Sequence, residues 1–132
     1  MSQEVFVTYE QAVKLKELGF DWECNHWYHP LELGKIIDCQ TYCNHNSFER
    51  PYSAPTLAQA QKWLRDKHNL FVHVYLHLDD CWRYEIQCIF NHENYMYEPD
   101  AGLWWRSYEQ TLSAGIDKAL ELLKQQSNGN QD

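Results

Sequence analysis

Two neighbouring stretches that alternate apolar and polar residues constrain this chain more than any other feature. They are LFVHVYLHL (70–78) and WRYEIQCIF (82–90). Successive side chains of a strand point to opposite faces, so this period of two predicts two strands with one apolar face each. In an antiparallel hairpin, the two apolar sets lie on the same face of the sheet only if the loop around residues 79–81 has an odd number of residues. A slip of one residue would turn the apolar side chains of one strand to the other face. The other face would then carry His73, Tyr75 and His77 beside Arg83, Glu85 and Gln87.

Three amphipathic stretches predict helices over 9–18, 57–68 and 108–124, each with apolar residues at helical spacing. Each begins with Ser or Thr followed three residues later by Gln: Thr8 and Gln11, Thr56 and Gln59, Ser107 and Gln110. Such a pair satisfies two free backbone N–H groups at the start of a helix. Capping therefore explains why TYEQ and SYEQ occur near opposite ends, since the residues after them do not align. Gly19 and Asn69 are expected to end the first two helices.

The remaining segments complete an α+β pattern. WECNHWYH (22–29) and KIIDCQTYC (35–43) predict a second hairpin, and YMYE (95–98) predicts a short edge strand. The stretch 44–55 contains two prolines and predicts a surface loop. We expect a single α+β domain over 1–126, of order α-β-β-α-β-β-(β)-α, followed by a flexible polar tail, 127–132. Its helices would pack on one face of a mainly antiparallel sheet; a parallel neighbour across the 57–68 helix is the alternative.

Size, charge and cysteine number exclude several classes of protein. A chain of 132 residues has the usual size of one domain. Its formal charge of −8 disfavours nucleic-acid binding. Without a basic leader or an apolar run of about 18 residues, we expect a cytoplasmic protein with no membrane partner. The five cysteines are then expected to be reduced thiols.

The region from Cys24 to His45 is the strongest candidate for a metal site. It contains the zinc-binding residue types Cys24, His26, His29, Cys39, Cys43 and His45. Their spacing is not that of a zinc ribbon, and strand geometry would place Cys24 and His26 on one face with His29 on the other. We therefore favour buried thiols and half-exposed histidines without a cofactor. The alternative is a metal- or small-ligand-binding protein that uses Cys24, His26, Cys39 and Cys43.

Catalytic motifs are absent from the sequence. Walker, dinucleotide-binding and nucleophile-elbow patterns do not occur, and no cysteine lies in a recognisable Cys–His motif. His73 and His77 would lie roughly 13 Å apart along a strand, too far to share one ion. A solvated polar face is the simpler interpretation. A small enzyme acting through His73, Tyr75 and Glu85 is the third hypothesis, and no catalytic residue is assigned.

Aromatic residues are the remaining candidates for a functional surface. LWWRSY (103–108) places Trp104 and Trp105 just before the last helix. If this segment is extended, the two rings project to opposite faces, so that one can be in the core and the other exposed. Exposed rings are common anchors for protein partners. The leading hypothesis is a non-catalytic accessory or protein-binding module, which could also be a homo-oligomer, with Trp104 and Trp105 as candidate contacts.

The segment YSAPTLAQAQKWLRDKHNL (52–70) resembles small proteins of gut Bacteroidetes and their phages or mobile elements. The matching residues are Gly19, Phe20, Cys24, 54–56, 62–65, His68, Tyr108, Gly115, Ile116, Ala119 and Leu120. The late match departs from the family pattern, because TLSAGIDKAL has Thr-Leu where the family has Ala-Leu. The resemblance implies a bacterial or phage cytoplasmic setting. It brings no established activity, so it assigns no functional residue.

Overall fold

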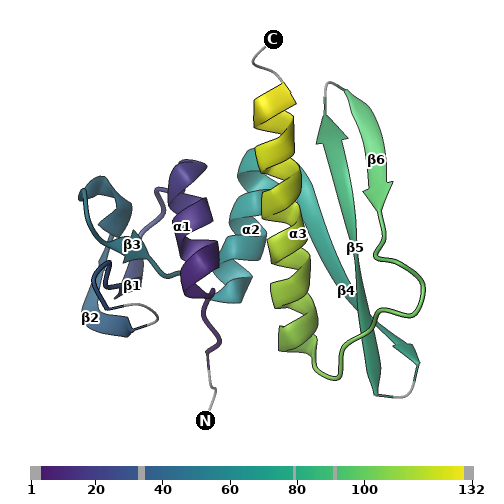
Figure 1. Ribbon diagram of the computed structural model, residues 1–132, viewed down its shortest axis with the longest axis horizontal. Helices are drawn as coiled ribbons and strands as arrows, with labels where there is room; N and C mark the ends of the chain where they lie inside the picture. The colour runs from purple at the N-terminus through teal and green to yellow at the C-terminus, as the bar shows by residue number, and fades with distance from the viewer. Residues whose placement is uncertain (1–3, 33–34, 79, 91, 130–132) are drawn as a thin grey trace. The chain divides into compact units, whose positions relative to one another are not determined.

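The computed structural model describes residues 4–32, 35–78, 80–90 and 92–129 (Figure 1). The elements are α1 (Tyr9–Glu17), β1 (Cys24–Tyr28), β2 (Ile36–Cys43), the 3-10 helix η1 (His45–Ser47), β3 (Tyr52–Ser53), α2 (Leu57–His68), β4 (Leu70–Leu78), β5 (Cys81–Phe90), β6 (Glu93–Tyr97) and α3 (Tyr108–Gly129). This confirms the α+β class and the predicted order. The two-residue strand β3 is an addition within the predicted loop.

The chain divides into two compact units, residues 1–58 and 59–132, each with its own three-stranded sheet. The sheet orders are β2-β1-β3 and β4-β5-β6. Every pairing between the described strands is antiparallel, so these strands do not form the parallel neighbour considered above. One cooperative domain over 1–126 stays a prediction. Residues 130–132 of the predicted tail lie outside the described part, and α3 continues past the expected end at 124.

The helix ends follow the sequence signals. Thr8 and Gln11 form the predicted capping box, with Gln11 N–H donating to Thr8 Oγ1 at 3.1 Å and Thr8 N–H donating to Gln11 Oε1 at 2.8 Å. Ser107 Oγ accepts the N–H of Gln110 at 3.1 Å. Asn69, directly after α2, has a φ of 56°, the left-handed conformation predicted for this helix end. No helix among the described residues has the length and apolar character required to cross a membrane.

In the first unit, a large irregularity interrupts the predicted hairpin of β1 and β2. Cys24 pairs with Cys43, and the next pair in register is His26 with Asp38. Between these two pairs β1 advances by two residues and β2 by five, so residues 39–42 form a bulge opposite Asn25. A bulge redirects side chains that would otherwise alternate along a strand. The side chains of this part of β2 therefore do not follow the predicted alternation.

In the second unit, the hairpin of β4 and β5 has the predicted register. Val72 pairs with Ile86 and Val74 with Tyr84, so the two apolar sets share one face. The loop differs from the prediction, because β4 ends at Leu78 and β5 begins at Cys81, leaving two residues between them. A register shift between Leu76 and Leu78 adds one residue on the β4 side. With it, the number of residues between the regularly paired positions is odd, as the shared apolar face requires.

Helix α3 lies against the apolar face of β4 and β5 (Figure 1). The buried residues of this layer are Leu70, Val72, Tyr84, Ile86, Cys88, Leu112, Ile116, Ala119, Leu120 and Leu123. Gly115 is the point of closest approach, because a Cβ atom there would lie 2.5 Å from Cγ1 of Val72. α3 begins at Tyr108, and the position of this first residue determines how far toward the end of the β4–β5 hairpin the helix covers the apolar face.

Candidate functional site

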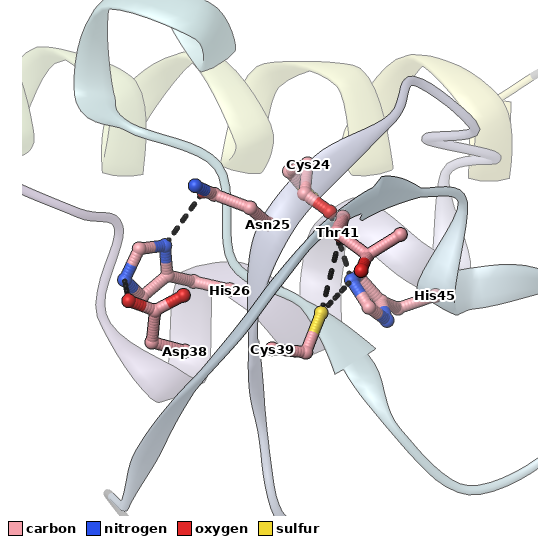
Figure 2. A network of polar contacts seen from close by, with 7 residues as sticks. All are labelled: Cys24, Asn25, His26, Asp38, Cys39, Thr41 and His45. Carbon is pink, nitrogen blue, oxygen red and sulfur yellow. Dashed lines mark hydrogen bonds and ion pairs between the residues drawn. The ribbon is translucent and has the colours of Figure 1, made fainter.

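The bulge in β2 and the start of η1 bring two thiols to one buried imidazole. The Sγ of Cys39 lies 3.5 Å from Nε2 of His45, and the Sγ of Cys43 lies 3.4 Å from Nδ1. Figure 2 shows Cys39 and His45 side by side beneath the backbone of Cys24. A regular strand would have separated Cys39 and Cys43 by roughly 13 Å. The bulge is therefore the feature that assembles this thiol–imidazole cluster (Cys39, Cys43 and His45).

The hydrogen bonds of the cluster fix which thiol faces the basic nitrogen. Nε2 of His45 lies 2.8 Å from the carbonyl oxygen of Cys24. A carbonyl oxygen only accepts, so Nε2 carries the proton and Nδ1 of the neutral ring is the acceptor. The thiol of Cys39 donates to the carbonyl oxygen of Thr41 at 3.2 Å. The Sγ of Cys43 lies 3.4 Å from Nδ1 and 3.6 Å from Nε2. Because Nε2 donates its proton to the Cys24 carbonyl, Nδ1 is the ring nitrogen that can accept a proton from this thiol.

Burial raises the pKa of two thiols in this region, those of Cys43 and Cys24. Desolvation raises the pKa of Cys43, and the neighbouring Cys39 and the Glu23 carboxylate raise it further. Desolvation also raises the pKa of Cys24, which is almost wholly buried. A reactive thiolate requires a lowered pKa, usually from a nearby positive charge. The arrangement therefore holds a protonated thiol with a base beside it, not a resting nucleophile.

The predicted metal ligands separate into two groups. The thiols of Cys39 and Cys43 and the backbone carbonyl of Cys24 lie next to His45. The side chain of His26 points elsewhere, toward Asn25 and Asp38 (Figure 2). Nδ1 of His26 lies 2.7 Å from Oδ1 of Asn25, and its Nε2 lies 3.9 Å from the Asp38 carboxylate. Within the described residues, no three His, Cys, Asp or Glu side chains are placed to hold a metal ion together. The metal-binding alternative stays a prediction.

The polar face of the second sheet carries a row of rings. His73 pairs in register with Glu85 across the hairpin. The rings of His73 and Tyr75 stack with centroids 5.7 Å apart, and Tyr75 meets His77 edge-on at 6.4 Å. His73 and His77 are exposed. The stacked rings are typical of a solvated sheet face. The enzyme hypothesis for His73, Tyr75 and Glu85 stays a prediction.

A cavity of about 370 Å³ opens near the other end of the same sheet. Its lining residues are Arg65, Asn69, Phe71, Gln87, Cys88, Ile89, Asn94 and Tyr95. The size falls within the range of small-molecule sites. Arg65 is the cation in this lining, and its Nε already faces Asp66 at 3.6 Å. An anionic ligand would have to compete with that carboxylate, so we assign no ligand to the cavity.

Trp104 and Trp105 face different surroundings. Trp105 forms two backbone hydrogen bonds with Trp82, of 2.7 and 2.9 Å, and its half-buried ring lies 5.3 Å from the ring of Tyr84. Trp104 is exposed, with the guanidinium of Arg106 5.4 Å from its ring centre. One ring is thus packed against the sheet and the other is available to solvent.

An apolar surface remains where α3 does not reach the end of the hairpin. We define the hairpin-end patch as Leu76, Trp82 and Tyr108, with the exposed Leu78 next to it along the chain. Leu76 pairs with Trp82, and the ring of Tyr108 meets that of Trp82 edge-on at 5.6 Å. The exposed fractions are 58% for Leu76, 63% for Leu78 and 41% for Tyr108. The predicted alternation holds for Leu76, which pairs with Trp82, but the register shift after Leu76 interrupts it, and Leu78 pairs with Cys81. The alternation also could not predict that α3 would begin too late to bury Leu76.

No protein family, no curated protein and no solved structure matches this chain. The two candidate sites of the described residues are the thiol–imidazole cluster and the hairpin-end patch.

Proposed function

We propose that this chain is a non-catalytic protein-binding module of bacterial or phage origin, and that the hairpin-end patch is its binding surface. The observation that carries the proposal is the exposure of Leu76 and Tyr108 beside Trp82, which pairs with Leu76 and meets the ring of Tyr108. A partner that removes apolar surface from water gains about 25 cal/mol of binding free energy per Å² covered. Contiguous exposed apolar patches are typical of interaction sites, and Trp and Tyr dominate the energetics of such contacts.

Charge around the patch selects the kind of partner. Asp80 lies two residues after Leu78, and Glu109 follows Tyr108. The nearby cations are already engaged, since Arg83 donates to the Pro99 carbonyl and Arg106 lies over the ring of Trp104. The chain as a whole has a formal charge of −8. A second copy would bring acidic groups against acidic groups, which disfavours association. The best-matched occupant is therefore a protein segment whose apolar side chains are flanked by Lys or Arg.

A peptide-display selection with the full chain tests this proposal. We expect the enriched peptides to combine apolar anchors with basic flanks, and their binding to weaken as salt is added. Leu76→Asp should weaken binding of a selected peptide at least about tenfold, equivalent to about 1.4 kcal/mol. Leu31→Asp is the matched control, because Leu31 is an exposed leucine in the other unit. It should leave the affinity unchanged.

Three results would count against the proposal. Equal losses for both variants would mean that the patch is not the contact surface. Enriched peptides without basic residues would contradict the charge argument. A stable dimer by light scattering that Leu76→Asp dissociates would replace the basic partner with a second copy of the chain.

A further inference from the structure

Cys24 and Cys43 occupy directly opposed positions on β1 and β2. Opposed residues of antiparallel strands have Cα atoms about 4.5–5.5 Å apart. A disulfide requires a Cα separation of about 4.4–6.8 Å. The Cα separation of opposed strand positions therefore fits a disulfide between Cys24 and Cys43, although the two cysteines are nineteen residues apart in the sequence.

The surroundings of the two thiols differ, and the difference indicates which thiol would react first. Cys24 is 1% exposed, whereas Cys43 is half-buried and can be reached from solvent. Cys43 also has a proton acceptor, Nδ1 of His45, at 3.4 Å. A base oriented by a third group is the arrangement that activates a thiol which is protonated at rest. Here the third group is the Cys24 carbonyl.

We propose that Cys43 is an oxidation site for hydroperoxides, and that Cys24 then closes a cross-strand disulfide with it. The thiol proton of Cys43 passes to Nδ1 of His45, and Sγ attacks one peroxide oxygen. The O–O bond breaks, an S–O bond forms, and the leaving oxygen takes the proton from the imidazolium as alcohol or water. The product is a sulfenic acid at Cys43, the reversible first step of thiol oxidation.

The second step uses the opposed thiol. Sγ of Cys24 attacks Sγ of Cys43, the S–O bond breaks and the S–S bond forms. The departing hydroxide and the thiol proton of Cys24 leave as water. Over both steps the cysteines lose two electrons and the hydroperoxide gains them. Cys39 is not the expected resolving thiol, because its S–H is already bound to the Thr41 carbonyl.

Peptide mapping of the full chain tests the proposal. The reduced protein is treated with hydrogen peroxide, remaining thiols are alkylated, and peptides are analysed without reduction. We expect a peptide pair joined through Cys24 and Cys43, while Cys81 and Cys88 in the second unit remain open to alkylation after unfolding. Cys39→Ser is the matched control and should retain the link. Cys24→Ser should instead accumulate a sulfenic acid at Cys43 that dimedone traps.

The pH dependence gives a second readout. Because burial and its neighbours raise the pKa of Cys43, direct oxidation should keep accelerating above the pKa of a free thiol, about 8.5. His45→Gln should slow oxidation near neutral pH by about 100-fold or more, as expected for loss of a general base. A link between Cys39 and Cys43, or oxidation of Cys81 as fast as that of Cys43, would overturn the assignment.

Discussion

Replacing Ile86 with alanine is expected to lower the free energy of unfolding by about 2–5 kcal/mol, the usual cost of truncating a buried isoleucine. Ile86 is fully buried, and it pairs with Val72 on one side and Tyr97 on the other. Truncation leaves a cavity in the layer between the sheet and α3, which the close-packed neighbours fill only partly. Urea denaturation followed by tryptophan fluorescence measures the loss.

Ile89→Ala is the matched control for this prediction. Ile89 lies on the same strand, three residues further on, but its side chain is 48% exposed and points to the other face. Its truncation should cost less than about 1 kcal/mol, within the span of strand propensities and surface substitutions. Equal losses at both positions would contradict the assignment of the buried face of β5.

Gly115→Ala is expected to destabilise the second unit by about 1–2 kcal/mol, even though alanine is the better helix former. The new Cβ would lie 2.5 Å from Cγ1 of Val72 and 3.2 Å from the ring of Tyr84, and both neighbours are buried. Overpacking a core costs about 1–3 kcal/mol. The gain in helix propensity returns only about 1 kcal/mol. Thermal or urea denaturation of the purified variant measures the net effect.

A Val72→Ala background identifies the cause of that loss. This change removes the Cγ1 atom that the new Cβ would meet. Gly115→Ala made in this background should therefore be neutral or stabilising by up to about 1 kcal/mol, so the sign of its effect reverses or vanishes. If Gly115→Ala costs the same in both backgrounds, close approach to Val72 is not the reason for a glycine in α3.

The parts of the fold that the sequence predicts are those set by local chemistry. The pairs Thr8 with Gln11 and Ser107 with Gln110 mark helix starts because a cap depends only on neighbouring residues. The alternation around Val72 and Ile86 predicts the shared apolar face because the period of a strand is fixed at two. Asn69 predicts a helix end for the same local reason.

The parts that the sequence does not predict depend on long-range contacts. A period of two would separate Cys39 from Cys43, and only the bulge opposite Asn25 brings both thiols to His45. The same alternation places Leu76 on the apolar face but contains no information about where α3 begins. The thiol–imidazole cluster depends on the bulge in β2, and the hairpin-end patch depends on the start of α3. Neither feature can be read from the alternation of a regular strand.

Hydrogen exchange of the full chain, with and without a selected basic peptide, tests most directly whether the hairpin-end patch binds a partner. We expect amides in residues 76–82 and 103–108 to exchange more slowly when the peptide is bound, because the peptide covers the end of the hairpin. Residues 24–45 should exchange at unchanged rates. Protection confined to residues 24–45, with none at 76–82, would contradict the proposed function.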